Sequence, residues 1–334
     1  MFNRSSLKIA AFVIFSLGWG SVSSFAVPER IRVGHFPNVT HAPALVARAT
    51  KHFESRLGEG VQIEWKTFNA GPEAIEALFA GAIDILYVGP NPAINGYIRS
   101  KGDALRIVAG VASGGAGFVV REGSRIERFE DIRGKRIAGP QKGNTQDVAL
   151  HHLMREKGLV SKTEGGDVEV FHIAGGDQIT TFLKEQVDAI WTVEPWLTRL
   201  AAEAKGKILF EEGELWPNAK YATTVLVVRR KFLEEHHDLA KKWVDAHVEM
   251  IEWINNNYTQ AEKLFNEEFE RETGKSLPPA YLDRFFARIE FTADPMEFSV
   301  RESAARAFAI GYLGRDKPDL TNLYELSLLK KEDR

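Results

Sequence analysis

Six short segments of this 334-residue chain combine glycine with small polar and aromatic side chains, and each follows a strand-like run. Five of them lead into a stretch with helical spacing. The first residues of a helix leave backbone N–H groups unpaired and carry a partial positive charge. Several helix starts that meet at one cleft would therefore bind an anion. The residues that we expect to contact the ligand are His35, Phe36, Asn38, His41, Gly89, Pro90, Asn91, Ser113, Gly114, Gly115, Gln141, Gly143, Asn144, Thr145, Gln146, Asp177, Glu194 and Trp196.

Charged side chains are scarce in these segments, and each one would narrow the kind of ligand. Glu194 is the acid that we expect nearest the cleft, where it would favour a ligand with an amine beside its acid; its alternative role is to bond nearby backbone N–H groups. Trp196 is expected to form a cleft wall, whereas Trp191, among apolar neighbours, is expected in the core. Lys142 is the only cation in these segments, and no arginine marks a particular anion.

The sequence carries no recognisable catalytic or metal-binding motif. It contains no cysteine, which excludes disulfides, thiolate metal sites and a cysteine nucleophile. A serine elbow, a phosphate-binding loop of the Walker type, a zinc-binding helix and a usefully spaced pair of acids are absent as well. His35 and His41 lie six residues apart on one loop and make a poor metal pair. We therefore expect a binding protein without catalytic residues, metal or cofactor.

The elements that must position these segments alternate between strands and helices. Apolar runs separated by helical patterns predict an α/β protein with largely parallel sheets. The expected strands cover residues 31–34, 61–65, 84–89, 105–111, 117–120, 136–138, 168–173, 189–192 and 222–228. After residue 237 we predict long helices, such as 239–269, and no strand. Because two strand-rich blocks precede a helical tail, we predict interleaved lobes: residues 27–116 plus 223–334 as lobe one, and 117–222 as lobe two.

The N-terminus has the features of a secretory signal peptide. A basic stretch with Arg4 and Lys8 precedes an apolar run from Ile9 to Trp19, and small residues end at Ala26. A run of this length is too short to span a membrane, which takes roughly 20 apolar residues. We predict that residues 1–26 are a leader cleaved after Ala26 and that the mature protein lies in the periplasm. Removal of two basic residues changes the formal charge from −3 to −5, which argues against nucleic acid as a partner.

Five segments resemble the nitrate, sulfonate and taurine class of periplasmic substrate-binding proteins of ABC importers. These segments are Phe68–Pro72, Ala77–Asp84, Asp131–Ala138, Gly143–Gln146, and Val187–Trp191 with the nearby Glu194–Trp196. The resemblance implies a bilobal type II periplasmic-binding-protein fold, with two crossing segments and a helical C-terminal tail. It also implies that neutral donors hold the ligand between the lobes and that the protein presents the ligand to a membrane permease.

Two other functions stay open at the level of sequence. Carriers of thiamine-type pyrimidine precursors resemble this chain too, and Trp196, Phe36 or Tyr221 would then stack on the ring. The fold also resembles that of a fungal thiamine-pyrimidine synthase, which uses iron and a cysteine-rich segment. The absence of cysteine argues against that enzyme. We therefore favour a monomeric carrier of a small anion, such as an organosulfonate or a taurine-like or nitrate-like ion.

Overall fold

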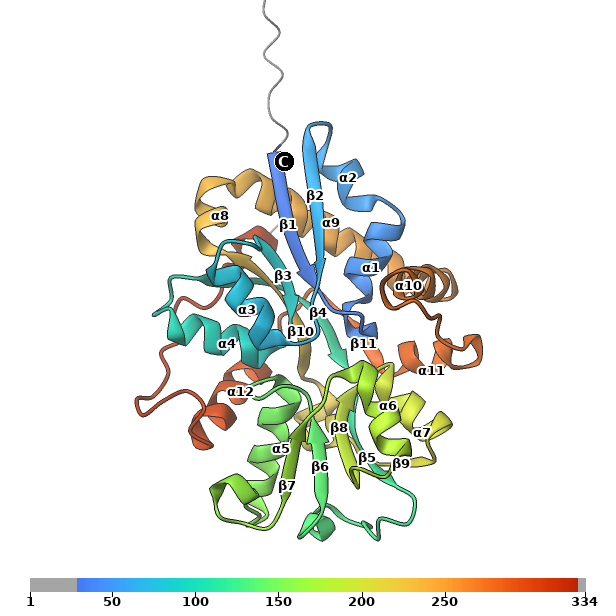
Figure 1. Ribbon diagram of the computed structural model, residues 1–334. Helices are drawn as coiled ribbons and strands as arrows, with labels where there is room; N and C mark the ends of the chain where they lie inside the picture. Colours follow the sequence, from blue (N-terminus) through green and yellow to red (C-terminus); the bar gives the residue numbers. More distant parts are fainter. Residues whose placement is uncertain (1–28, 330–334) are drawn as a thin grey trace, which may run out of the picture.

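The computed structural model describes residues 29–329, and it contains two β-sheets, drawn one above the other in Figure 1. The predicted leader and its cleavage after Ala26 lie outside the described residues. We call the six-stranded sheet with its helices the first lobe. The five-stranded sheet with α5, α6 and α7 is the second lobe.

The first sheet has the strand order β11-β4-β10-β3-β1-β2. Its strands are β1 (Glu29–His35), β2 (Val61–Thr67), β3 (Ile85–Val88), β4 (Leu105–Gly114), β10 (Ala222–Arg229) and β11 (Ile289–Phe291). Strand β1 runs parallel to β2 and β3, whereas β10 pairs antiparallel with both β3 and β4. All four residues of β3 are buried, because helices cover both faces of the sheet.

The helices of the first lobe form two groups. Their bounds are α1 (Ala42–Ala49), α2 (His52–Leu57), α3 (Gly71–Phe79), α4 (Pro90–Arg99), α8 (Arg230–Glu235), α9 (His237–Asn256), α10 (Tyr258–Thr273), α11 (Leu282–Ala287) and α12 (Glu297–Ala309). Helices α1, α2, α9 and α10 pack together on one side, and α3, α4 and α12 pack together on the other (Figure 1). Each group buries its own hydrophobic core against the sheet.

The second sheet has the strand order β7-β6-β8-β5-β9. Its strands are β5 (Ala116–Arg121), β6 (Arg136–Gly139), β7 (Glu169–His172), β8 (Ala189–Val193) and β9 (Gly206–Glu211), and its helices are α5 (Thr145–Glu156), α6 (Gly175–Leu183) and α7 (Trp196–Glu203). Strand β6 is parallel to β7 and β8, and β5 is antiparallel to β8 and β9. Trp191 lies on β8 and is fully buried, as the sequence predicted.

The chain crosses between the lobes twice. It leaves the first sheet after Gly114, enters the second at Ala116, and returns between Glu211 and Ala222. Gly114 has a φ of 84°, and a side chain there would meet the carbonyl oxygen of Arg288 at 2.5 Å, so the first crossing requires glycine. The return strand β10 inserts into the middle of the first sheet. The predicted bilobal α/β fold is therefore confirmed.

Three elements differ from the sequence-based expectation. The helix predicted over residues 239–269 is two helices, α9 and α10, which meet at Asn257 with φ −138° and ψ 44°. The prediction of no strand after residue 237 is wrong, because β11 lies there. This strand is only three residues long and is defined by its pairing with β4, so its sequence is too short to show an alternation. Strand β9 was not predicted either. It is a half-exposed edge strand, so its sequence lacks the apolar run of a buried strand.

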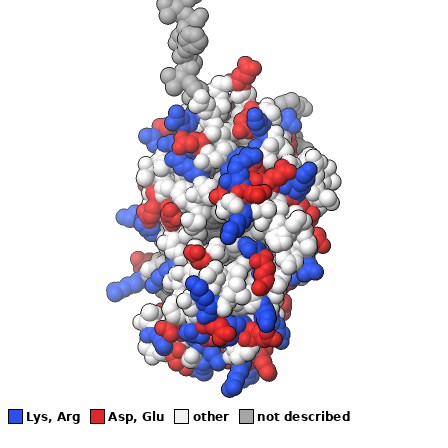
Figure 2. Space-filling model, turned by 45° about the vertical axis from the view of Figure 1, so that its right-hand side comes forward, with Lys and Arg blue, Asp and Glu red and all other residues white. Residues whose placement is uncertain are grey.

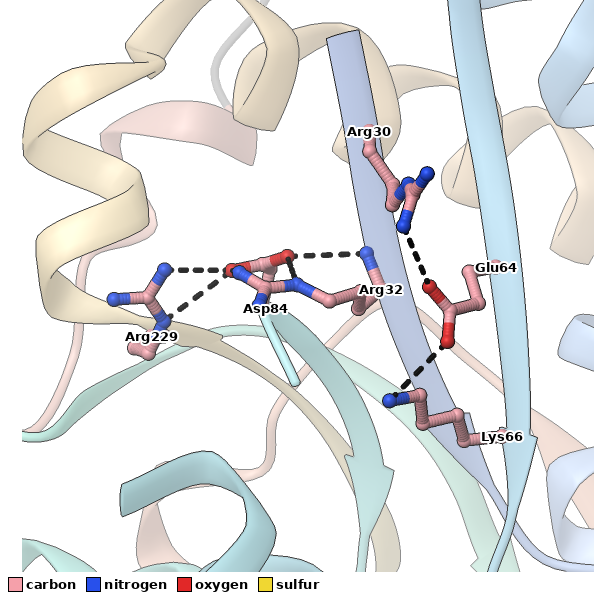
Figure 3. Close-up of polar contacts among 6 residues, drawn as sticks. All are labelled: Arg30, Arg32, Glu64, Lys66, Asp84 and Arg229. Atoms are coloured by element: carbon pink, nitrogen blue, oxygen red, sulfur yellow. Dashed lines mark hydrogen bonds and ion pairs between the residues drawn. The ribbon is translucent and has the colours of Figure 1, made fainter. Parts of the chain in front are cut away.

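A buried carboxylate ties three strands of the first sheet together (Figure 3). Asp84, which is fully buried, accepts hydrogen bonds from Arg32 Nε at 2.7 Å and from Arg229 Nη2 at 2.6 Å. Burial alone would raise the pKa of Asp84, but the hydrogen bonds from these arginines outweigh it and lower the pKa. Asp188 repeats this arrangement in the second lobe with Arg136 and Arg121.

The surface of the protein carries charges of both signs. On the face drawn in Figure 2, basic and acidic side chains are interspersed over both lobes. Several of them form exposed ion pairs within one helix, such as Lys241 with Asp245 on α9. Within residues 29–329, none of the helices combines the length and the apolar character that a membrane crossing requires.

Candidate ligand-binding cleft

A cavity of about 70 Å³ lies between the two lobes. A water molecule needs about 10–15 Å³ of such volume, so the cavity has room for roughly five to seven water-sized atoms. Its lining residues are Phe36, Asn38, Thr40, His41, Asn69, Ala70, Gly89, Pro140, Asn144, Thr145, Gln146, Gly175, Gln178, Thr192, Val193, Trp196, Thr223 and Thr224. Both sheets contribute to it, so the cavity exists only where the lobes meet.

Six helices of the described chain begin at or beside lining residues of this cavity. They are α1, α3 and α4 of the first lobe and α5, α6 and α7 of the second. Pro72 and Pro90 lie in the first turns of α3 and α4, where the missing N–H has no helical partner to lose. Asn144 is the N-cap of α5, a position that favours its side chain. These local signals accord with the observed starts of α3, α4 and α5.

Two asparagine side chains bond across the cleft with their oxygen ends. The Trp196 indole N–H donates to Asn38 Oδ1 at 3.2 Å, and the Gly71 amide donates to Asn144 Oδ1 at 3.1 Å. An indole N–H and a backbone N–H can only donate, so these contacts fix which end of each asparagine amide is the oxygen. Within residues 29–329, neither side-chain NH₂ group has a hydrogen-bond partner. Both amides therefore keep a donor available beside the cavity.

Further hydrogen bonds hold the two lobes together at the cleft. The Asn91 amide donates to Thr145 Oγ1 at 3.4 Å, and the Val39 amide donates to the Glu194 carbonyl oxygen at 3.1 Å. A Cβ added at Gly89 would lie 2.5 Å from Thr145 Oγ1, so the lobes approach as closely as glycine allows. The structure thus shows the lobes in direct contact around the cavity.

Hydroxyl groups add to the set of neutral donors. Thr224 is 1% exposed, and its Oγ1 has no hydrogen-bond partner in the described part of the chain. Thr192 instead donates to Gln178 Oε1 at 2.6 Å, and Thr223 donates to the Gly114 carbonyl at 2.6 Å. A buried hydroxyl without a partner costs free energy, so Thr224 is a natural contact for a bound oxyanion.

No Lys, Arg, Asp or Glu is among the residues of 29–329 that line the cavity. The one histidine among these lining residues is His41. Burial lowers the pKa of His41 well below its ordinary value, and the nearby His35 lowers it further. His41 is therefore neutral at pH 7. Within the same residues, no cluster of three or more His, Asp or Glu side chains could hold a metal ion. The site offers neutral donors and helix starts rather than acid–base chemistry.

The structure brings eight of the expected residues into the cavity lining and leaves ten outside it. The eight are Phe36, Asn38, His41, Gly89, Asn144, Thr145, Gln146 and Trp196. The ten are His35, Pro90, Asn91, Ser113, Gly114, Gly115, Gln141, Gly143, Asp177 and Glu194. Pro90 and Asn91 form the first turn of α4 just behind Gly89.

His35 lies on the opposite side of the strand end from the cavity. Its Nε2 is 2.5 Å from Glu272 Oε1, and its ring packs edge-on against Trp65 with centroids 5.5 Å apart. Successive side chains of a strand point to opposite faces, so His35 and Phe36 point to different sides. This orientation excludes the His35 side chain from the cavity lining.

The crossing segment Ser113–Gly115 packs against the first lobe instead of the cavity. Ser113 Oγ accepts from the Tyr221 amide at 3.3 Å, and a Cβ at Gly115 would meet Ile289 at 2.6 Å. The other four outlying residues, Gln141, Gly143, Asp177 and Glu194, belong to the second lobe. Gln141 and Asp177 are exposed, and the Gly143 amide donates to Asp147 Oδ2 at 2.8 Å.

Glu194 is fully buried, and its carboxylate bonds to the first turn of the following helix, α7. Its carboxylate accepts from the Thr198 amide at 3.1 Å and from Thr198 Oγ1 at 2.7 Å, and Arg288 of the first lobe lies 3.3 Å away. Burial raises the pKa of Glu194 to about 7, even though the Thr198 hydrogen bonds and Arg288 act in the opposite direction. Of the two roles that the sequence allowed, the structure shows bonding to nearby backbone N–H groups.

Ten lining residues were not expected, and their signals differ in strength. They are Thr40, Asn69, Ala70, Pro140, Gly175, Gln178, Thr192, Val193, Thr223 and Thr224. Most lie within segments that the sequence had marked as loops or strand ends. Thr223 and Thr224 had no such signal, because they belong to β10, which reads as an ordinary apolar strand and reaches the cavity only through its antiparallel insertion.

The fold and the cleft define a two-lobed α/β ligand-binding protein. The model of the NMT1-like family matches residues 26–265, and the chain belongs to this family. A Bacillus subtilis (strain 168) protein named for aliphatic sulfonate binding is 27% identical over 273 residues, which is 79% of this chain and 78% of the relative. The predicted resemblance to sulfonate-class substrate-binding proteins is thereby confirmed.

Solved structures agree on the fold. The alkanesulfonate-binding protein SsuA from Xanthomonas axonopodis pv. citri, bound to MOPS, superimposes with a TM-score of 0.72 at 21% identity, covering 87% of this chain and 96% of that one. The desulfurization enzyme DSZB has a TM-score of 0.62 at 16% identity, with coverage of 90% and 97%. Because a binding protein and an enzyme both match, the fold by itself does not specify a function.

Proposed function

We propose that this protein captures a small anion, such as an organosulfonate, between its lobes and delivers it to the membrane permease of an ABC importer. The observation that carries this proposal is the orientation of Asn38 and Asn144. Their oxygens are held by donor-only groups, so NH₂ groups remain for a ligand. A sulfonate group has three acceptor oxygens and no donor, so it matches this donor set.

Helix starts strengthen the same preference without any fixed charge. Six helix N-termini surround the cavity, and each contributes a partial positive charge. Inside a small site shielded from water, such dipoles act more strongly than they would in solvent. A fully ionised anion can therefore be held by dipoles and neutral donors in place of its water shell.

Capture is coupled to closure of the lobes. We take residues 27–116 plus 223–334 as one moving body and 117–222 as the other. The bonds from Trp196 to Asn38 and from Gly71 to Asn144 join the two bodies and orient the donors. Closure therefore completes the site, and a ligand that contacts both lobes shifts the population toward the closed form.

The relatives support this assignment and its location. The B. subtilis relative is named for aliphatic sulfonate binding, and the X. axonopodis structure is named for alkanesulfonate binding. A carrier of this kind works outside the inner membrane, which accords with the leader predicted at residues 1–26. We propose the periplasm as its compartment and a single permease as its protein partner.

The alternatives find less support in the cleft. Tyr221, a candidate for stacking on a pyrimidine, instead stacks on Trp216 with ring centroids 5.5 Å apart, and it is not among the lining residues. Turnover would require an acid or a base in the cavity. Among its described lining residues, none is Asp, Glu, Lys or Arg, and burial lowers the pKa of His41, which makes this histidine a weak base. We therefore propose binding without turnover.

The test begins with protein purified without refolding. Native mass spectrometry is expected to detect a retained small anion, and calorimetry is expected to show binding of propane-1-sulfonate but not of a thiamine-type pyrimidine. Failure of sulfonate, sulfate and nitrate all to bind would refute the proposal. Chemical consumption of the bound ligand during incubation would refute binding without turnover.

A further inference from the structure

We infer that the captured anion carries no positively charged group, so that this site selects a short alkyl or hydroxyalkyl sulfonate against its amino analogue, taurine. This inference rests on the proposed function and makes its ligand class narrower. Its basis is that no acidic residue is among the residues of 29–329 that line the cavity, together with the engagement of three amide oxygens of that lining.

An ammonium group would find no counter-charge in the closed cleft. None of the described residues that line the cavity is acidic. Glu194, the acid that the sequence placed nearest the ligand, is held by Thr198 and Arg288 and is not among the lining residues. The nearby carboxylate of Asp147 is also fully buried and is bonded to the Gly143 amide and to His172 Nε2 at 3.0 Å.

Three amide oxygens of the lining are already occupied. The side-chain oxygens of Asn38 and Asn144 accept from the indole of Trp196 and the amide of Gly71. Gln178 Oε1 accepts from Thr192 Oγ1 at 2.6 Å. These three amides can therefore offer a ligand only their NH₂ groups, which are donors. Donors suit an oxyanion and repel a cation.

The aromatic rings of the lining, Trp196 and Phe36, offer little attraction to a cation. Trp196 is the indole of the lining, and the guanidinium of Arg199 lies over its ring, 5.4 Å from the centroid. Phe36 packs against His41 with ring centroids 4.7 Å apart. Cation–π attraction therefore cannot replace the missing carboxylate, because one ring already has a cation and the other packs on an imidazole.

The small size of the cavity makes this mismatch costly. The cavity volume is about 70 Å³, so the head group and the far end of a short sulfonate would share one small compartment between the lobes. An ammonium group there would leave bulk water without gaining an ion pair from the described residues of the lining. Burial of an unpaired charge is among the most unfavourable events in a protein interior.

Three sulfonates of equal size test the inference by calorimetry at pH 7. Propane-1-sulfonate, isethionate and taurine have the same number of non-hydrogen atoms and differ only in a terminal CH₃, OH or NH₃⁺ group. We expect the first two to bind and taurine to bind at least about 100-fold more weakly, because its charge is buried unpaired. Taurine binding within tenfold of propane-1-sulfonate would overturn the inference while leaving sulfonate capture intact. Failure of all three to bind would overturn the inference, and failure of sulfate and nitrate to bind as well would refute the proposed function.

Two variants then locate the cause of the selectivity. Asn38→Asp keeps an acceptor for the Trp196 indole but adds a carboxylate to the cavity wall, so the affinity ratio of taurine to propane-1-sulfonate should rise at least about tenfold. Glu194→Gln removes an acid that does not face the ligand, so the ratio should stay unchanged. The ratio compares two ligands on one variant, so it is insensitive to any general weakening. An unchanged ratio in the first variant, or a fall in the second, would overturn the inference.

Discussion

Substitution of Asn144 by aspartate changes one donor of the cleft while leaving the fold its contacts. The side-chain oxygen that accepts from the Gly71 amide at 3.1 Å is retained, and aspartate is as good an N-cap for α5 as asparagine. The NH₂ group is replaced by a negatively charged oxygen. Asn144→Asp therefore places an anion beside the position that we assign to an anionic ligand.

The size of the effect follows from Coulomb's law. Two like charges about 4 Å apart repel by about 4 kcal/mol at an effective dielectric constant of about 20. Since each 1.4 kcal/mol corresponds to a tenfold change, the affinity for propane-1-sulfonate should fall about 1,000-fold. The melting temperature of the free protein should not fall, because the N-cap and the bond to Gly71 survive.

Calorimetry and thermal unfolding of the same preparations provide the measurement. Asn322→Asp is a matched control, because it adds the same charge at an exposed turn of the C-terminal segment. We expect the control to bind as the parent protein does. A folded Asn144→Asp variant whose affinity lies within threefold of the parent would show that Asn144 does not face the ligand.

Three further predictions test closure, the buried carboxylates and the effect of pH. Gly89→Ala should weaken ligand binding at least about tenfold, because the new Cβ would meet Thr145 Oγ1 of the opposite lobe. The melting temperature should change little, because the backbone φ of −62° suits alanine. Unaltered affinity would show that the lobes need not approach this closely. Asp84→Asn should lower the free energy of unfolding by about 3 kcal/mol in urea titrations, because it leaves two arginines without their buried carboxylate, and an unchanged midpoint would contradict this. Burial raises the pKa of Glu212 from 4.5 to about 7, so its contribution to stability is full below pH 4.5 and is lost as the pH rises through 7. Glu212→Gln, which keeps an acceptor for the Trp191 indole, should reduce the loss of stability between pH 5 and pH 8 by up to about 3 kcal/mol, and parallel pH profiles of the two proteins would refute this assignment.

Much of the cleft followed from short stretches of sequence. Asn144, Thr145 and Gln146 were expected at a helix start facing the ligand, and the structure places all three in the cavity lining at the start of α5. Gly89 was expected at a tight turn before a helix, and its lack of a side chain is what lets Thr145 approach. Such signals are readable because helix caps and turns depend on residues only a few positions apart.

The direction of individual side chains was harder to predict. His35 and Glu194 lie in the expected segments, yet one bonds Glu272 of α10 and the other bonds Thr198 and Arg288. A strand's alternation and the capping of a following helix turn them away from the cavity. Two of these partners are far away in sequence: Glu272 lies 237 residues from His35, and Arg288 lies 94 residues from Glu194.

By itself, the sequence determined the alternation of strands and helices, most helix starts, the likeness to sulfonate-class binding proteins and eight of the eighteen residues that line the cleft. Only the tertiary structure decided that Thr223 and Thr224 reach the cavity, that the side-chain oxygens of Asn38 and Asn144 are engaged across the cleft, and that no acid is among the described residues of the lining. The reason is physical: local backbone preferences are set by near neighbours, whereas the polarity of a cleft between two lobes depends on which distant groups satisfy one another's hydrogen bonds when the lobes meet.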